Sequence, residues 1–302
     1  MKLLIVGANG QLGAALQRAC RTRGWRPEAV DLPAVDIADA KSAHAAVEQS
    51  TPDLVVNAAA YTAVDRAEEE PAAAFGANRD GPRHLAQACR QAGIALIHIS
   101  TDYVFDGTTG RPYAEDDPPS PLGVYAKSKA AGEEAVRNDL PAHMIVRTSW
   151  LYSPEGRNFV RSMIRIGKTE RTVRVVADQF GSPTSAADLA AAVLVLAEQS
   201  VSAHAPAWGT YHFCNRGVTS WHGFAEAIFA GVRGRIPLRV EQVEPIGTMQ
   251  LQAAAPRPGY SALSCERIRR RFGIVPRPWE QSLAEVLEKL VAEEQAGRER
   301  RR

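Results

Sequence analysis

Cysteine is scarce in this chain of 302 residues, and the four cysteines present are widely scattered. No pair of them has the spacing of metal ligands, and they do not form the dense pattern of a disulfide-stapled domain. His212, Cys214 and His222 are near one another in the sequence but lack paired spacing, so we assign them structural roles. The sequence therefore predicts free thiols in a reducing compartment and no metal site.

An excess of charge of one sign is also absent. Lysine and arginine number 36 against 34 aspartates and glutamates, which leaves a net charge of +2. This balance gives no strong field that would favour a nucleic acid or an anionic membrane as a partner. Residues 298–302 are basic, but a short charged chain end is typical of a solvated tail.

Long apolar runs are missing as well. No segment approaches the roughly 18 apolar residues that are needed to span a bilayer. The apolar run at residues 3–6 is too short for the core of a signal peptide. We therefore expect a cytoplasmic protein without a membrane partner.

What the chain does contain is a regular alternation of short apolar segments and amphipathic ones. We expect strands at residues 3–6, 28–31, 54–57, 95–100 and 144–147, and helices at residues 12–23, 41–49, 72–91 and 125–137. This order predicts an α/β fold in which helices cover both faces of a parallel sheet. The pattern weakens beyond residue 150, where we expect helices at 160–166, 188–198, 221–232 and 282–294 and a strand at 211–214. We divide the chain into a domain at 1–150, a smaller mixed α/β lobe at 151–295, some of whose segments return to the first domain, and a basic tail at 296–302.

A glycine-rich turn joins the first expected strand to the first expected helix. Gly7, Gly10 and Gly13 have the spacing G-x-x-G-x-x-G. The first glycine allows a tight turn, the second lets the backbone approach a pyrophosphate, and the third lets helix and strand pack closely. Free N–H groups at the start of the helix would hold the phosphates. This context predicts a Rossmann-type doubly wound sheet in which residues 1–150 bind a dinucleotide.

Acidic and small residues follow the next two strands. Asp31 lies roughly 20 residues beyond the glycines, where an acid can bond the adenosine ribose, although a solvated loop acid is the alternative. No lysine or arginine immediately follows Asp31, which tilts the prediction slightly toward NADH. Asp36 and Ile37 could flank the adenine, and the alanines at residues 58–60 leave room for a ligand at the carboxyl edge of the sheet.

Tyr125 and Lys129 lie four residues apart on an expected helix, so their side chains share one face. A nearby ammonium lowers the pKa of a phenol, which lets the phenol exchange a proton with a substrate oxygen. Thr101, at the end of the fourth strand, could bring a second hydroxyl to the same oxygen. Thr101 would orient a carbonyl oxygen and Tyr125 would protonate it, while Lys129 would hold the nicotinamide ribose. A surface tyrosine beside a solvated lysine is the alternative for this spacing alone.

Longer motifs carry a family resemblance that runs from residue 1 to about residue 290. The most specific of them are Val56-Asn-Ala-Ala-Ala-Tyr-Thr-Ala-Val-Asp65, Ser100-Thr-Asp-Tyr-Val-Phe105 and Asp178-Gln-Phe-Gly-Ser-Pro-Thr184. With the glycine turn, they make the chain resemble the dTDP-4-dehydrorhamnose reductase family of extended short-chain dehydrogenase/reductases. The resemblance implies that NADPH or NADH reduces the C4 keto group of dTDP-4-dehydro-L-rhamnose to give dTDP-L-rhamnose.

The resemblance also implies roles for matching residues. The catalytic set would be Thr101, Tyr125 and Lys129. Together with the glycine turn and Asp31, the resemblance gives the following residues that would bind the dinucleotide: Gly7, Gly10, Gln11, Leu12, Gly13, Asp31, Asp36, Ile37, Ala58, Ala59, Ala60, Tyr125 and Lys129. The nucleotide sugar, bound chiefly by the lobe at 151–295, would contact Thr62, Val64, Thr101, Tyr103, Trp150, Asn158 and Arg257. An indole such as that of Trp150 can stack on a sugar or base, and the guanidinium of Arg257 is a forked donor for phosphate. The alternative for Trp150 is that it only fills the core, and the alternative for Arg257 is that it is a surface arginine in a loop.

One departure from that family concerns a metal ion. Some of its members bridge a dimer through Mg²⁺ held by glutamates. At the matching places this chain has Ala14 and Ala15, and Ser185-Ala-Ala187, so the carboxylate cluster that a hard cation needs is missing. We therefore predict no Mg²⁺ bridge, and a monomer rather than a metal-linked homodimer.

Two other functions stay open. A nucleotide-sugar epimerase or dehydratase of the same superfamily would retain NAD⁺, and a dehydratase needs a second acid where this chain has Tyr103 after Asp102. A regulatory subunit would bind the dinucleotide without catalysis. The complete set of Thr101, Tyr125 and Lys129 argues against that second alternative.

Overall fold

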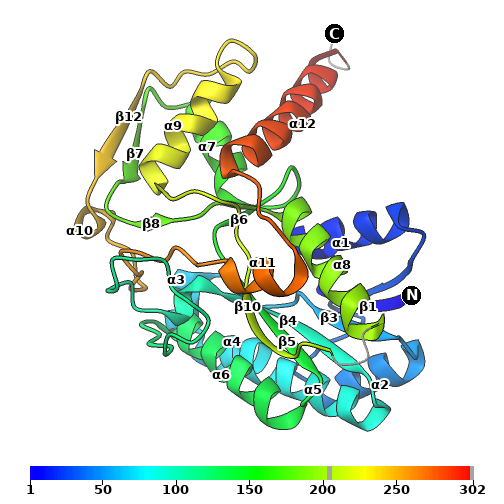
Figure 1. The fold of residues 1–302 in the computed structure, drawn as a ribbon. Helices are drawn as coiled ribbons and strands as arrows, with labels where there is room; N and C mark the ends of the chain where they lie inside the picture. The colour runs from blue at the N-terminus through cyan, green and yellow to red at the C-terminus, as the bar shows by residue number, and fades with distance from the viewer. Residues whose placement is uncertain (203–205, 300–302) are drawn as a thin grey trace.

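A six-stranded parallel sheet forms the centre of the computed structural model, which describes residues 1–202 and 206–299 (Figure 1). The strands lie in the order β10-β5-β4-β3-β1-β2, and every neighbouring pair is parallel. They span β1 (Lys2–Val6), β2 (Arg26–Val30), β3 (Leu54–Asn57), β4 (Ala95–Thr101), β5 (His143–Thr148) and β10 (Gly209–His212). The predicted α/β fold with a parallel sheet is confirmed.

Helices cover both faces of this sheet. One face carries α2 (Ala40–Ser50), α5 (Gly81–Ala92) and α6 (Val124–Asp139), and the other carries α1 (Gln11–Thr22) and α8 (Ala186–Ser202). Side chains alternate between the faces along each strand: Leu3 and Ile5 enter the cluster under α1 and α8, whereas Leu4 and Val6 enter the opposite one. Because both faces are buried there, the inner strands β1 and β3 are mostly apolar, and this is why they could be recognised in the sequence.

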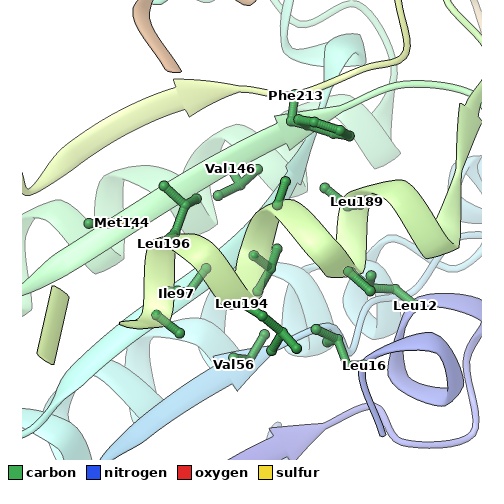
Figure 2. Close-up of a cluster of buried hydrophobic side chains, with 14 of the residues drawn as sticks. Leu12, Leu16, Val56, Ile97, Met144, Val146, Leu189, Leu194, Leu196 and Phe213 are labelled. Atoms are coloured by element: carbon green, nitrogen blue, oxygen red, sulfur yellow. The ribbon is translucent and has the colours of Figure 1, made fainter. Parts of the chain in front are cut away.

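The cluster under α1 and α8 joins the two halves of the chain. Figure 2 shows Leu189, Leu194 and Leu196 of α8 lying against Leu12 and Leu16 of α1 and against strand residues. Burying each such side chain stabilises the fold by about 1.5–3 kcal/mol. Two elements that follow residue 150 therefore belong to the first domain: β10 is a strand of its sheet, and α8 covers one face of that sheet.

The smaller lobe surrounds a second apolar cluster. Its helices are α7 (Phe159–Gly167), α9 (Trp221–Val232) and α12 (Trp279–Glu299), and they pack on the parallel pair β7 (Thr172–Val176) and β12 (Gln242–Ile246). Two short pairs lie near the junction, β6 (Leu151–Tyr152) with β9 (Thr184–Ser185) and β8 (Phe180–Gly181) with β11 (Thr219–Ser220). The division at residue 150 stays a prediction.

Several elements differ from the expected ones. The helix expected at 72–91 is three consecutive elements, α4 (Pro71–Phe75), the π-helical η1 (Gly76–Asp80) and α5. Elements that the sequence did not reveal include α3 (Val64–Glu69), the 3₁₀ turn η2 (Asp102–Val104), α10 (Thr248–Leu251) and α11 (Glu266–Phe272). The predicted tail is wrong for residues 296–299, which continue α12, and residues 300–302 lie outside the described part of the chain.

None of the helices in residues 1–202 and 206–299 is both long and apolar enough to cross a membrane.

Candidate active site

The glycine turn between β1 and α1 is closed to side chains. Gly7 has φ +86°, and a Cβ placed there would lie 2.5 Å from the backbone nitrogen of Ala59. A Cβ on Gly13 would lie 2.1 Å from the carbonyl oxygen of Gly7. Gly10 is the N-cap of α1, and no side chain of the described residues caps this helix. The first backbone N–H groups of α1 are therefore available to an anion.

A cavity of about 690 Å³ opens above this turn at the carboxyl ends of the strands. This volume is in the range of small-molecule sites. The predicted residues that line it are Gly7, Gly10, Gln11, Leu12, Asp31, Asp36, Ile37, Ala58, Ala59, Ala60, Thr62, Thr101, Tyr125, Lys129, Trp150 and Asn158. Gly13, Val64, Tyr103 and Arg257 do not line it. A larger hollow of about 1190 Å³ between α7 and α12 contains none of the three predicted catalytic residues.

Two predicted catalytic hydroxyls meet in this cavity. Thr101 ends β4, where its hydroxyl accepts a hydrogen bond from the backbone nitrogen of Tyr103 at 3.2 Å and donates to Asp102 at 3.1 Å. Tyr125 lies in the first turn of α6. Burial raises the pKa of the Tyr125 phenol to about 12, although a hydrogen bond with Thr101 opposes the shift. The phenol is therefore fully protonated at neutral pH.

Lys129 is buried one helical turn beyond Tyr125. Its ammonium bonds the backbone and not the phenol. Its Nζ donates to the carbonyl oxygen of Ile99 at 2.7 Å. Burial lowers the pKa of Lys129 to about 8, against the opposing charge of Glu133. Lys129 is not among the groups that shift the pKa of Tyr125. In the protein without ligands burial is the largest influence on the pKa of Tyr125, and the acidifying role of Lys129 stays a prediction.

Asp102 is a further acid at this point, and burial raises its pKa to about 7. Its side chain is 2% exposed and one carboxyl oxygen bonds Thr101. The other oxygen, Oδ2, has no partner within hydrogen-bonding distance among the described residues, although the Ser261 hydroxyl is near enough to oppose the pKa shift. Burial thus moves the pKa of a carboxyl beside the Thr101 and Tyr125 hydroxyls up toward neutral pH.

Behind the cavity lie two buried residues that the sequence did not single out. The register of β3 and β4 pairs Asn57 with His98, and their side chains meet at 3.1 Å. His98 Nε2 is 3.5 Å from Lys129 Nζ. Asn57 lies in the motif at residues 56–65, but His98 lies in none of the quoted motifs, so only the strand register could have revealed the contact.

A buried ion pair anchors α6 to the sheet. Glu133 is fully buried and accepts from Arg147 of β5 at 2.8 and 2.7 Å and from Ser100 of β4 at 2.6 Å. Burial alone would raise the pKa of Glu133, but the hydrogen bonds and charge of Arg147 hold it below its usual value. Because Glu133 follows Lys129 by one helical turn, this clamp fixes the position of both Lys129 and Tyr125.

Three predicted substrate residues, Val64, Tyr103 and Arg257, form a group beside the cavity. Arg257 bonds Asp65 of α3 at 2.7 Å and also bonds the Tyr103 hydroxyl. The Tyr103 ring meets the Tyr125 ring edge-on at 6.0 Å, and Val64 begins α3. Arg257 is thus not a free surface arginine, because its side chain is 16% exposed and pairs with Asp65 and with the Tyr103 hydroxyl.

Trp150 lines the cavity in a left-handed backbone conformation, with φ +45°. Its ring stacks on Trp221 with centroids 3.6 Å apart and planes 7° apart, and it lies so close to Gly181 that a Cβ there would be 2.6 Å from it. One face of the indole is therefore already covered. Trp221 leaves no room for a sugar or base on that face, and stacking of a ligand on the rest of the indole stays a prediction.

Asn158 lies on the dinucleotide side of the cavity. Its Nδ2 donates to Gln11 Oε1 at 3.0 Å, and Ser153 donates to the same oxygen at 3.1 Å. Asn158 also caps α7 by accepting from the backbone nitrogen of Arg161. The loop before α7 is thereby joined to the start of α1.

Metal ligands do not gather anywhere in residues 1–202 and 206–299: no group of three His, Cys, Asp or Glu side chains could hold an ion. Of the residues assigned structural roles above, His212 is fully buried and Cys214 lies with its sulfur 3.7 Å from that of Cys265.

Comparison with known proteins identifies the family. The model of the family described as RmlD substrate binding domain matches residues 1–292. A dTDP-4-dehydrorhamnose reductase of Sinorhizobium fredii is 41% identical over 298 residues, with 97% of this chain and 99% of the relative covered. One of Streptomyces griseus is 45% identical, with 93% and 91% covered. The chain belongs to the dTDP-4-dehydrorhamnose reductase family.

Solved structures agree with this family. A dTDP-4-dehydrorhamnose reductase of Clostridium acetobutylicum is 38% identical and superposes with a TM-score of 0.89, covering 96% of this chain and 99% of that one. A reductase of Bacillus anthracis in complex with NADP is also 38% identical, with a TM-score of 0.88 and coverage of 95% and 99%. The fold is shared more widely: a Thermus thermophilus UDP-glucose 4-epimerase in complex with NAD has a TM-score of 0.78 at 22% identity, with 96% and 99% covered. The predicted family and the Rossmann-type fold are confirmed.

Proposed function

We propose that this protein reduces the C4 keto group of dTDP-4-dehydro-L-rhamnose to give dTDP-L-rhamnose, with NADPH or NADH as the hydride donor. The observation that carries the proposal is the meeting of the Thr101 and Tyr125 hydroxyls in the same cavity as the glycine turn. Membership of a family whose relatives bear this activity in their names supports it.

The residues present fit a dinucleotide. The turn at Gly7 and Gly13 has no room for side chains, the first N–H groups of α1 are uncapped, and the wall includes the small residues at 58–60. Gly7, Gly10, Gln11, Leu12 and Gly13 would hold or shape the pyrophosphate site. Asp31, Asp36, Ile37 and the alanines at residues 58–60 would border the adenosine half. A bound reduced nicotinamide supplies the hydride.

The chain's own residues then handle the oxygen and the proton. Thr101 orients the C4 carbonyl oxygen through its hydroxyl. Tyr125 donates its phenolic proton to that oxygen as negative charge develops there, which is general acid catalysis. Lys129 would hold the nicotinamide ribose of a bound cofactor. Trp150 and Arg257 lie on the lobe side, where Arg257 would meet the diphosphate as a forked donor.

Replacing Tyr125 by phenylalanine tests the assignment. Tyr125→Phe should lower kcat by about 10²–10⁴-fold, because it removes the general acid, and should leave the dissociation constant of NADPH nearly unchanged. The assay follows oxidation of NADPH and of NADH with dTDP-4-dehydro-L-rhamnose. Thr101→Val is the companion variant, and Tyr61→Phe, which changes a tyrosine bonded to Glu70, is the matched control.

Full activity of Tyr125→Phe would contradict the assignment. The same preparation separates the alternatives that the sequence left open. NAD⁺ that stays bound through desalting would favour an epimerase, and stoichiometric cofactor binding without oxidation on any nucleotide sugar would favour a regulatory subunit.

We further propose that the protein acts as a monomer without a metal bridge and without nucleic acid. The near-neutral charge balance supports this, as do the alanines where a bridging carboxylate would be needed. Light scattering with and without Mg²⁺ tests the oligomeric state. The cytoplasmic location and the sugar-nucleotide assignment of residues 151–295 stay predictions.

A further inference from the structure

Asn57 is held in a single orientation at the end of β3. Its side chain is fully buried, and its Oδ1 accepts from the backbone nitrogen of Ala59 at 3.1 Å. Because a backbone N–H can only donate, the atom facing Ala59 must be the oxygen. The amide nitrogen Nδ2 therefore faces His98 Nδ1, at 3.1 Å.

This orientation decides the tautomer of His98. An amide NH₂ group only donates, so His98 Nδ1 must be the acceptor and carries no proton. Burial, with the charge of Lys129 adding to it, lowers the pKa of His98 well below its usual value, so the ring is neutral. A neutral imidazole has one N–H, which must be on Nε2.

The Nε2–H of His98 then faces Lys129. The two nitrogens are 3.5 Å apart, and Lys129 Nζ donates at the same time to the Ile99 carbonyl. An ammonium has no lone pair, so it cannot accept from Nε2–H, whereas a neutral amine can. The contact is satisfied only when Lys129 has lost its proton.

We propose that His98, locked in the Nε2–H tautomer by Asn57, is a positioning residue that favours the neutral amine of Lys129. It thereby sets the pH below which Lys129 carries its charge into the cofactor cavity. This deepens the proposed function and rests on it for the catalytic consequence. The tautomer argument itself depends only on the three side chains and two backbone groups.

Other charged and titratable groups also face this position. Glu133 follows on the same helix and its charge raises the pKa of Lys129, but Arg147 and Arg137 pair with that carboxylate. From β5, His143 lies close enough to act on His98. Asp102 lies beyond, beside the phenol. None of these groups can accept or donate at His98 Nε2 in place of Lys129.

The test measures how stability depends on pH. Wild type and His98→Gln are each compared with their Lys129→Met counterparts by urea unfolding across pH 6.5–10. For the wild type, the free energy of unfolding relative to Lys129→Met begins to rise at the pH that equals the pKa of Lys129 in the folded state. Glutamine offers an oxygen that accepts from an ammonium, so His98→Gln should move this point up by about one pH unit or more.

Asn57→Leu supplies an independent variant. Without the amide, His98 can place its proton on Nδ1 and accept from the ammonium, so the shift should have the same direction. His143→Gln is the matched control, because this buried histidine bonds Leu140 and not Lys129. The basic limb of the kcat profile should move with the stability curve.

An unchanged or lowered transition in both His98→Gln and Asn57→Leu would overturn the inference. If His98→Gln does not fold, Asn57→Leu alone decides. If the stability curves shift but no variant and no wild type oxidises NADPH on the sugar nucleotide, the inference about Lys129 stands and the proposed function fails.

Discussion

Lys129→Met should make the stability of this protein less dependent on alkaline pH, because it removes a buried charge. In the folded chain Lys129 is 2% exposed and burial lowers its pKa from 10.5 to about 8. Between these two pKa values the unfolded chain binds more protons than the folded one. The energetic cost of burying the charge is therefore fully present below about pH 8 and disappears as the pH rises toward 10.5.

The size of the effect follows from the shift. Each pKa unit corresponds to about 1.4 kcal/mol, so the buried charge costs the wild type about 3 kcal/mol at neutral pH. At about pH 9.5 most amines in the folded state have lost their protons, and the remaining cost is about 1 kcal/mol. Relative to Lys129→Met, the wild type should thus gain about 2 kcal/mol between pH 7 and pH 9.5. This is a large share of the 5–15 kcal/mol that typically stabilises a domain.

Urea unfolding of both proteins at four or five pH values measures this difference directly. Thiols and phenols that titrate in the same range are common to both proteins and cancel. The hydrogen bond from Lys129 to Ile99 is lost at every pH, so it changes the offset between the curves and not their slopes. Parallel curves from pH 7 to 9.5 would refute the reasoning, because they would mean that the ammonium is solvated in the folded protein.

Three further substitutions test the packing around the site. Gly13→Ala should abolish NADPH binding in a fluorescence titration, since its Cβ would lie 2.1 Å from a backbone oxygen of the glycine turn; normal affinity would contradict this. Glu133→Gln should cost about 3–5 kcal/mol in urea unfolding, because it leaves Arg147 buried without its anion, and a loss within error would count against the ion pair. Trp221→Ala removes the stacking partner of Trp150, worth about 0.5–1.5 kcal/mol; it should raise KM for the sugar nucleotide about 2- to 10-fold, with Trp221→Phe as the milder control, whereas a change in kcat alone would not fit.

The central sheet could be predicted because its strands are buried on both faces. In a chain whose short apolar segments alternate with amphipathic ones, a short run such as Leu54–Asn57 indicates a buried strand of a parallel sheet. The short elements were harder, because they bury few side chains. Strand β12 includes Pro245, which weakens a strand signal. Helix α11 buries only Ile268 among its residues, and α3 only Ala67, so neither shows a helical apolar period.

The site was predicted as far as its residues belong to motifs. Residue type and spacing were enough to recognise the glycine turn, Thr101, Tyr125 and Lys129. They do not reveal the contact between Asn57 and His98, because it depends on the register of two strands whose residues are 41 positions apart. The same limit applies to the covered face of Trp150, which becomes visible only when α9 is packed against it.

The pKa of Tyr125 determines the protonation state in which the phenol meets a substrate. The sequence suggested a phenol made acidic by Lys129, which would suit a base that removes a proton from an alcohol. In the folded chain burial instead raises the pKa of Tyr125 to about 12. The alkoxide that forms when a ketone accepts hydride is about as basic as hydroxide, whose conjugate acid has a pKa of roughly 15.7, so proton transfer from this phenol to it remains downhill. A phenol that is protonated at neutral pH starts each reduction as the proton donor, and the phenolate that remains must regain a proton before the next turnover. Burial in the ligand-free site thus favours the protonated form from which reduction of a carbonyl group starts, whereas oxidation of an alcohol would start from the phenolate, which burial disfavours.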